Sequence, residues 1–147
     1  MCLRWIARHD LSGQRVLDYG CGSGILAIAA AKLGAKQLTA IDNDPQALLA
    51  TRENAARNQV ALDNATIALP PLNDDFRCDV IVANILAEPL RALAPSFAQW
   101  LPSGGKLVLS GLLATQGDEM IERYKTWFEH LQVQQIEDWI RISGIRR

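Results

Sequence analysis

The fold of this chain is decided by nine residues, 16–24, which read VLDYGCGSG. They begin as an apolar run typical of a buried strand and end in three alternating glycines. The next segment, residues 25–33, is Ala-rich and apolar almost all round, which predicts a helix packed on a sheet. Because glycine lets the backbone turn sharply and approach a ligand without Cβ collisions, the stretch predicts a binding loop at a helix N-terminus.

Outward from this loop, short β-branched and aliphatic runs alternate with longer helical patterns. The runs lie at residues 15–17, 37–41, 66–69, 80–83, 106–109, 132–136 and 139–142. This order predicts a Rossmann-like α/β fold, with a mostly parallel sheet and helices on both faces. Only two residues separate the last two runs, so we expect an antiparallel hairpin at the sheet edge.

Three features of the sequence predict where helices begin, end or lie. Gly34 follows the first helix where a left-handed residue ends it, and Asp44-Pro45 supplies an N-cap acceptor and a proline at the first helical position. A third set of apolar residues has helical spacing and predicts one amphipathic helix over 120–128. Its members are Met120, Ile121, Tyr124, Trp127 and Phe128.

Length and composition are those of one globular domain, residues 1–147. The hydrophobic share of 49% and the charged share of 21% are typical of a folded protein and not of a disordered tail. No apolar run reaches the roughly 18 residues of a transmembrane span, and the first residues lack the apolar core of a signal peptide. We therefore expect a cytoplasmic protein.

Charge and cysteine usage narrow the classes of function. The formal net charge is −1, from 15 basic and 16 acidic residues, which disfavours direct nucleic-acid binding without excluding it, since charge can cluster locally. The three cysteines and two histidines lie far apart in the sequence and fit neither a disulfide framework nor a metal site.

An acid precedes the glycines and indicates which ligand the loop takes. The pattern is D-x-G-x-G-x-G, with Asp18 two residues before Gly20. An anion at this place repels a pyrophosphate and attracts a cation. S-adenosylmethionine carries an ammonium and a sulfonium and no phosphate, so it suits Asp18 better than NAD does. The alternative is that Asp18 caps the turn structurally.

A second acid follows at the right distance. Asp42 ends the next strand run, 18 residues after Gly24. An acid at the tip of the second strand of such a unit can accept hydrogen bonds from both ribose hydroxyls of a nucleoside. The alternative is an ordinary turn residue at a strand end.

Asn84 ends the buried run 80–83 at the same edge of the predicted sheet. Its amide oxygen and a backbone carbonyl together offer two acceptors. Such a pair can bind the N–H bonds of an amine and aim the nitrogen lone pair at a methyl group. Asparagine also ends strands for turn reasons, and that alternative stays open.

With the glycine loop and its Asp18, Asp42 and Asn84 in this order, the sequence resembles class I S-adenosylmethionine-dependent methyltransferases. Within them it resembles the PrmA family, which methylates large-subunit ribosomal protein eleven. The stretches that carry the resemblance are VLDYGCGSGILAIAAAKLGA (16–35), IDNDPQAL (41–48), ENAARN (53–58), VANILAEPLRALAP (82–95), LSGLLATQ (109–116) and DWIRISG (138–144).

The resemblance implies a seven-stranded sheet in the order 3-2-1-4-5-7-6 with strand seven antiparallel, and methylation of α-amino and lysine ε-amino groups. Asn84 is then the expected catalytic residue. The expected cofactor-binding residues are Asp18, Gly20, Cys21, Gly22, Gly24, Asp42, Asn43 and Asn84.

Two features of the family have no counterpart in this sequence, namely a separate N-terminal substrate-recognition domain and a Thr/His-containing loop upstream of the first helix. One alternative function is therefore a non-catalytic S-adenosylmethionine-binding fragment. Others are a methyltransferase of the same fold acting on a small molecule, an RNA or a protein glutamine, and, outside that class, an NAD-dependent oxidoreductase.

Overall fold

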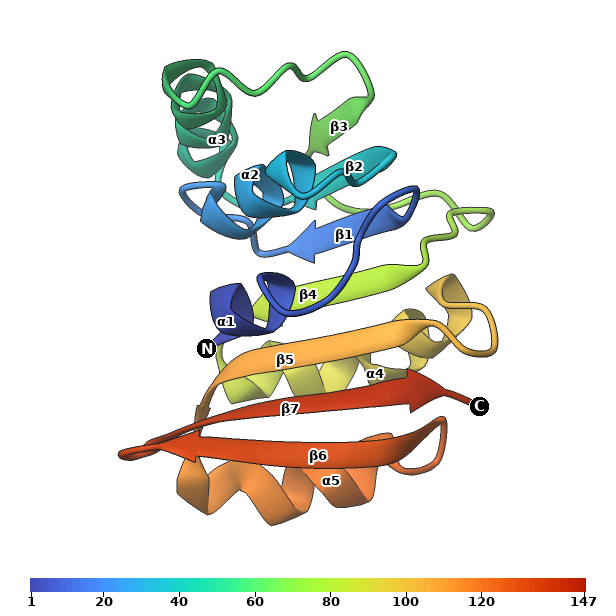
Figure 1. Ribbon diagram of the computed structural model, residues 1–147. Helices are drawn as coiled ribbons and strands as arrows, with labels where there is room; N and C mark the ends of the chain where they lie inside the picture. The colour runs from blue at the N-terminus through green and yellow to red at the C-terminus, as the bar shows by residue number, and fades with distance from the viewer.

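The computed structural model describes residues 1–147 and contains one seven-stranded sheet flanked by helices (Figure 1). The strands are β1 (Arg15–Tyr19), β2 (Gln37–Ile41), β3 (Ala65–Ala68), β4 (Val80–Asn84), β5 (Lys106–Leu113), β6 (Phe128–Ile136) and β7 (Trp139–Arg146). The helices are α1 (Cys2–Ile6), α2 (Ile25–Lys32), α3 (Pro45–Arg57), α4 (Ala87–Trp100) and α5 (Gly117–Tyr124), with a 3-10 turn at Ala114–Gln116. None of these helices has the length and apolarity that a membrane crossing needs.

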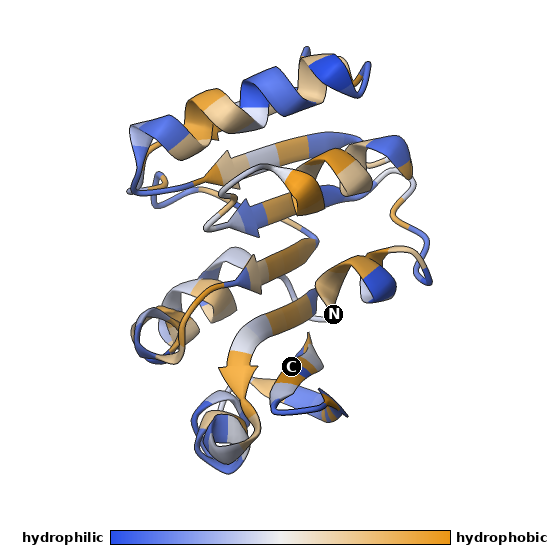
Figure 2. Cartoon of the chain, turned by 90° about the vertical axis from the view of Figure 1, so that its left-hand side faces the viewer, coloured by the Kyte–Doolittle hydropathy of each residue, from blue (hydrophilic) through white to orange (hydrophobic).

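The sheet has the predicted topology. Its strand order is β3-β2-β1-β4-β5-β7-β6, with the first five of these strands parallel. Strand β7 runs antiparallel to both β5 and β6, so the last two strands form the predicted edge hairpin. The carboxyl ends of β1, β2 and β4 therefore meet at one edge of the sheet, onto which Figure 2 looks.

Two apolar clusters hold the layers together. One lies between the sheet and α4 and α5, and the other lies between the sheet and α1, α2 and α3. The central strands β1 and β4 are buried on both faces, which explains their continuous aliphatic runs. Burial of each large aliphatic side chain contributes about 1.5–3 kcal/mol, so these two clusters are the main source of stability.

The predicted helix boundaries hold in two places and fail in one. Gly34 has φ +87°, and the Asp44 Oδ1 accepts from the Gln46 N–H at 2.9 Å, as a C-terminal stop and an N-cap require. The prediction of one helix over 120–128 is wrong. Helix α5 ends at Tyr124, and Phe128 begins β6.

The physical reason for that error lies in the core. Met120 and Tyr124 from α5 and Phe128 from β6 are all fully buried in the cluster beneath α4 and α5. A helix and the following strand thus bury apolar side chains in the same place, and no proline or glycine between them marks the break. The apolar spacing therefore continues across an element boundary.

Candidate cofactor and acceptor site

The glycine loop is anchored to the end of β2 by its own backbone. The N–H groups of Gly20 and Cys21 both donate to the Ile41 carbonyl, at 2.7 and 2.9 Å. Gly20 has φ +79°, and a Cβ at this position would collide with Ile85, the residue that follows β4. Gly24 has φ +81°, and its Cβ would lie 2.8 Å from Cγ2 of Thr51 on α3. These two glycines are therefore required by backbone conformation and by space.

Asp18 lies inside the molecule, at the end of β1 and beneath the loop. It is fully buried, and its Oδ2 accepts from the Ala27 N–H at the start of α2 at 3.0 Å. Its Oδ1 is buried without any hydrogen-bond partner. Burial raises the pKa of Asp18 to about 7, with a further contribution from the charge of Asp42, while the Ala27 N–H opposes the shift. Asp18 therefore has the structural role of stabilising the turn into α2, while its second carboxylate oxygen has no partner within the protein.

Asp42, directly after β2, ties two loops together. Its Oδ2 accepts from the Gly22 N–H at 2.9 Å, and its Oδ1 accepts from the Asp44 N–H at 3.0 Å. Each carboxylate oxygen can accept more than one hydrogen bond, so acceptor capacity remains on both. The carboxylate is thereby held in a fixed orientation and can still bind a diol.

Beside Asp42 lies a cavity of about 360 Å³. Its wall combines the ends of β1 and β2 with the first turns of α4. The lining residues are Tyr19, Gly20, Ile41, Asp42, Asn43, Ile85, Pro89, Ala92 and Leu93. A polar end at Asp42 and an apolar remainder suit a nucleoside, which has a diol at one end and a flat ring at the other.

A second cavity, of about 520 Å³, adjoins the first and shares Ile85 with it. It opens at Asn84, the last residue of β4, which is exposed and pairs in register with Ser110 on β5. The turn between β6 and β7 forms the far wall. The lining residues are Met1, Asn84, Ile85, Leu86, Ser110, Gly111, Ile136, Glu137 and Trp139.

The ribosomal protein L11 methyltransferase (PrmA) family model matches residues 1–147. The chain belongs to this family. It is 52% identical over 148 residues to the ribosomal protein L11 methyltransferase of Shewanella sp. (strain W3-18-1), covering 100% of this chain and 50% of that protein. It is 48% identical to the corresponding protein of Marinobacter nauticus, covering 100% of this chain and 49% of that protein. The chain thus spans about half the length of these curated relatives.

Solved structures agree with this assignment. The ribosomal protein L11 methylase of Lactobacillus delbrueckii subsp. bulgaricus superposes with a TM-score of 0.86 at 34% identity, over 99% of this chain and 77% of that one. An S-adenosylmethionine-dependent O-methyltransferase of Thermotoga maritima gives a TM-score of 0.84 at 14% identity, over 99% of this chain and 64% of that one. The second likeness shows the shared class I methyltransferase fold alone.

In this PrmA-family domain the predicted site residues take different places. Gly20, Asp42 and Asn43 line the first cavity and Asn84 lines the second. Asp18, Gly22 and Gly24 shape the loop behind them. A direct cofactor contact of any of these residues stays a prediction.

Cys21 is turned into the protein. Its N–H donates to the Ile41 carbonyl, its C=O accepts from the Gly24 N–H at 2.8 Å, and its Sγ accepts from the Thr51 hydroxyl at 3.4 Å. Burial raises the pKa of its thiol to about 11, so the group is neutral at physiological pH. Its cofactor contact also stays a prediction, although its polar groups are engaged within the domain.

Sequence reasoning missed the apolar walls of both cavities. Tyr19 and Leu93 line the first, and Trp139, which is 49% exposed, lines the second. Tyr19 follows Asp18 directly, so its position beside the loop was a usable signal. Leu93 and Trp139 are brought in only by the path of α4 and of the hairpin, which local sequence does not encode.

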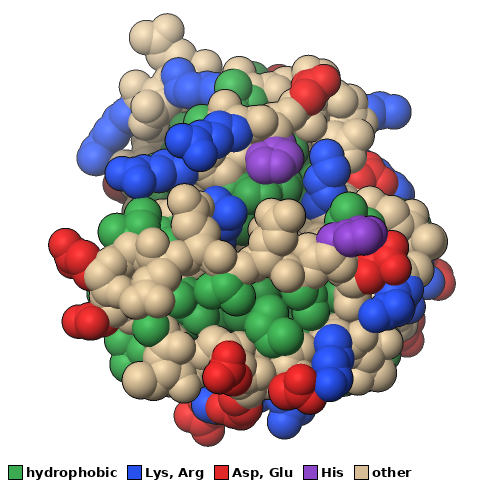
Figure 3. Space-filling model, turned by 60° about the horizontal axis from the view of Figure 1, so that its bottom comes forward, with side chains coloured by type: hydrophobic (Ala, Val, Ile, Leu, Met, Phe, Trp, Pro, Cys, Tyr) green, Lys and Arg blue, Asp and Glu red, His purple; other side chains and the backbone are tan.

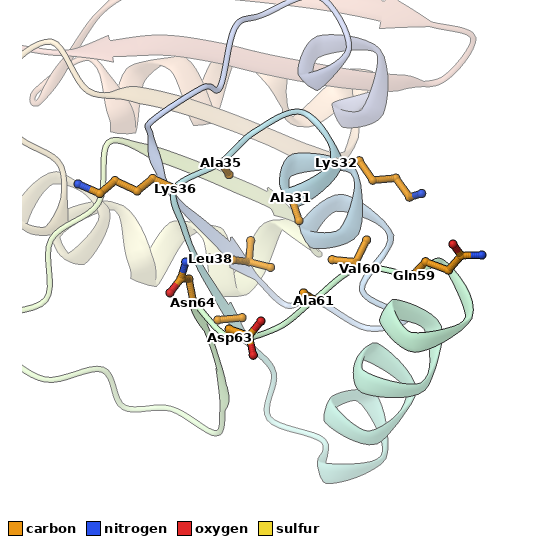
Figure 4. A pocket seen from close by; sticks show the side chains of 11 residues that line it. Ala31, Lys32, Ala35, Lys36, Leu38, Gln59, Val60, Ala61, Asp63 and Asn64 are labelled. Atoms are coloured by element: carbon orange, nitrogen blue, oxygen red, sulfur yellow. The ribbon is translucent and has the colours of Figure 1, made fainter.

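A third cavity, of about 320 Å³, lies at the opposite edge of the sheet, where α2 ends and β2 begins (Figure 4). Lys32 and Lys36 border it, but their side chains point away from its apolar centre. It contains none of the predicted site residues. The candidate functional site of this PrmA-family domain is therefore the carboxyl edge of the sheet. Nowhere in the domain do three or more His, Cys, Asp or Glu side chains meet in a possible metal site.

Proposed function

We propose that this domain binds S-adenosylmethionine and transfers its methyl group to an amino group, α-amino or lysine ε-amino, of a large-subunit ribosomal protein. The observation that carries the proposal is the pair of adjoining cavities at the carboxyl edge of the sheet. One is lined by the diol acceptor Asp42, the other opens at Asn84, and both contact Ile85. Membership of the PrmA family and the names of its relatives support the ribosomal substrate.

The residues of the first cavity fit the cofactor by their chemistry. The free acceptor capacity of Asp42 suits the two ribose hydroxyls, and the apolar wall with Tyr19 and Leu93 suits the adenine ring. Asp18 lies behind the glycine loop and does not line this cavity; its unpaired Oδ1 suits a cationic ammonium near the loop, since a buried acceptor without a partner is otherwise costly. When bound, S-adenosylmethionine supplies an electrophilic methyl group on its sulfonium.

Asn84 positions the acceptor amine in this proposal. Its amide oxygen, at the exposed end of β4, accepts an N–H bond and leaves the nitrogen lone pair free to point toward the first cavity. A lysine amine is mostly protonated at neutral pH, so only its minor neutral form can attack. The side-chain amide of Asn84 is not a base, so it cannot take the proton that the lysine ammonium must lose before the nitrogen attacks. That proton passes to solvent, because the edge of the sheet is open here. The contribution of Asn84 is therefore alignment, which can be worth several kcal/mol.

The test is a calorimetric titration of the folded chain with S-adenosylhomocysteine and, in parallel, with NAD. We expect saturable one-to-one binding of S-adenosylhomocysteine and none of NAD. The variant Asp42→Ala should weaken that binding, whereas Asp63→Ala, which removes an exposed acid at the opposite edge of the sheet, should leave it unchanged. Binding of NAD alone would overturn the cofactor assignment.

A second measurement addresses the acceptor. The chain is incubated with methyl-labelled S-adenosylmethionine and either ribosomal protein L11 or free RNA, and the labelled product is identified. Label on amines of the protein supports the proposal. Label on RNA, or on no acceptor in a sample that binds S-adenosylhomocysteine, contradicts the acceptor assignment and favours a different substrate or a binding-only domain.

A further inference from the structure

The face of the hairpin β6–β7 on the α1 side carries no helix (Figure 1). Ile140 and Ile142 of β7 are buried beneath α4 and α5, so the alternate residues Arg141 and Ser143 point to the opposite face. The register confirms this, because Ser143 pairs with Val108, which belongs to the cluster under α1 and α2. This open face is therefore polar and lies beside α1.

Four basic residues lie on or beside this face, which we call the basic surface: Arg4 on α1, Arg8 in the turn after α1, Lys106 at the start of β5 and Arg141 on β7. None of them forms an ion pair, whereas the six ion pairs of the domain all lie on other residues. In Figure 3, Lys and Arg side chains lie together with both histidines of the chain over this part of the molecule. A net charge of −1 thus hides a local excess of positive charge.

The cations of the basic surface are held close to one another at an energetic cost. Arg4 lies on α1, and Arg8 lies in the turn that follows this helix. Burial lowers the pKa of Arg141, and the positive charge of Arg8 lowers it further. The Arg141 Nε is buried and has no hydrogen-bond partner. An anionic oxygen beside the Arg141 guanidinium would relieve its repulsion by Arg8.

A cavity of about 200 Å³ lies in the same face, between α1 and the hairpin. Lys106 and the stacked pair Trp5 and His9, with ring centroids 3.8 Å apart, border one side. His130 and Gln132 of β6 border the other. Its amide and imidazole groups can hydrogen-bond to the edges of unpaired bases, which are accessible in a single strand and not in an RNA duplex.

The acids near this surface do not neutralise it. Hydrogen bonds from Ser12 lower the pKa of Asp10, and the charge of Lys106 lowers it further. Glu129 faces Arg147 and His130, at 3.8 and 3.7 Å. Neither acid is paired with Arg4, Arg8 or Arg141, which leaves the greater part of the basic surface free for an external anion.

From these observations we propose that the basic surface binds the sugar–phosphate backbone of single-stranded RNA. The inference goes beyond the proposed function and does not depend on it. The net charge disfavoured direct nucleic-acid binding in the sequence analysis. Net charge averages over the whole surface, however, whereas binding depends on the local charge.

The experiment measures the fluorescence anisotropy of a labelled, mixed-sequence RNA single strand of about 20 nucleotides, long enough to cover such a surface. We expect saturable binding whose Kd rises about 50-fold between about 50 and 200 mM KCl, as four phosphate contacts predict. The variant Arg4→Gln/Arg8→Gln should weaken binding at least about tenfold and halve the salt dependence. Arg141→Gln and Lys106→Gln, each removing one cation, should each reduce the salt slope by about a quarter.

The matched control is Arg57→Gln/Lys125→Gln, which removes two exposed cations from α3 and from the end of α5, away from this face. It should change the Kd less than about twofold. Absence of saturable RNA binding, or an equal loss in this control, would refute the proposal. So would tighter binding of a duplex or equal binding of a polyglutamate peptide. Titration with S-adenosylhomocysteine, which all variants should bind normally, separates this outcome from failure of the proposed function.

Discussion

Asp18 combines two demands in one side chain. Its Oδ2 holds the first turn of α2 through the Ala27 N–H, while its Oδ1 is buried without a partner. A carboxylate in such a place is disfavoured in the free domain, which is why its pKa is raised to about 7. The free domain thus carries a cost at this residue that a cationic ligand would offset.

The raised pKa predicts how the stability of the free domain depends on pH. The unfolded carboxyl titrates near 3.8 and the folded one near 7, so the stabilising contribution is complete below 3.8 and is lost as pH rises through 7. Asp18→Asn escapes this loss and should gain stability over the wild type by up to about 3 kcal/mol between about pH 5 and pH 8. Urea unfolding at both pH values measures the difference. An advantage that stays constant with pH would contradict a raised pKa.

Replacement of Asn84 should lower turnover without weakening the binding of S-adenosylhomocysteine. Because its side chain lies in the second cavity, Asn84→Ala should leave S-adenosylhomocysteine affinity within about twofold while lowering kcat by about 10²-fold or more. Single-turnover methyl transfer and calorimetry measure the two quantities. Equal losses in both would place Asn84 in cofactor binding instead.

Gly20 tests the requirement for space in the loop. Gly20→Ala combines a positive φ with a collision against Ile85, and we expect a loss of about 2–4 kcal/mol together with loss of S-adenosylhomocysteine binding. Gly13→Ala is the matched control, since Gly13 has φ +73° but open space around its Cβ, and should cost only about 1–2 kcal/mol. Denaturant unfolding compares the two. Similar losses would mean that backbone strain alone governs the loop.

At the scale of elements, local chemistry predicted beginnings and ends where a residue marks them. Asp44 and Pro45 begin α3 and Gly34 follows α2, because each residue type satisfies a specific backbone need. The end of α5 carries no such mark, and the strands β5, β6 and β7 extend further than their apolar runs. The strand pairing shifts in register between Leu109 and Leu112 of β5 and between Glu129 and Gln132 of β6. Such irregularities break the alternation by which a strand is recognised in a sequence.

One hydrogen bond joins α5 to α4, and its removal tests how much it contributes to the packing of these two helices. The buried Tyr124 hydroxyl donates to the Leu90 carbonyl at 2.8 Å. Tyr124→Phe should therefore cost about 1 kcal/mol and lower the Tm by about 2–4 °C. Tyr19→Phe, at the first cavity, is the matched control and should change the Tm by less than about 1 °C. Equal Tm values for Tyr124→Phe and the wild type would show that the bond is replaced by water.

At the scale of the whole molecule, the order of strands and helices was predictable because parallel α/β topology leaves few alternatives. The polar residues at the carboxyl edge were predictable for the same reason, since parallel strands bring their ends together. The apolar walls, such as Leu93 and Trp139, were not, because they depend on where a helix and a hairpin cross that edge. The basic surface was equally unpredictable from local sequence, because its cations come from α1, the turn after it, β5 and β7.

The position of Ile85 limits how this domain can be re-engineered. A Cβ on Gly20 would collide with the Ile85 side chain, and a Cβ on Gly111 would collide with the Ile85 backbone. Ile85 is therefore closely packed between these two glycines. Ile85 is the only residue that lines both cavities. Its side chain therefore separates them, and we expect a shorter side chain at this position to join the two cavities into one. A variant meant to enlarge the second cavity alone should keep Ile85 and replace Leu86, which is 71% exposed and lines that cavity and not the first.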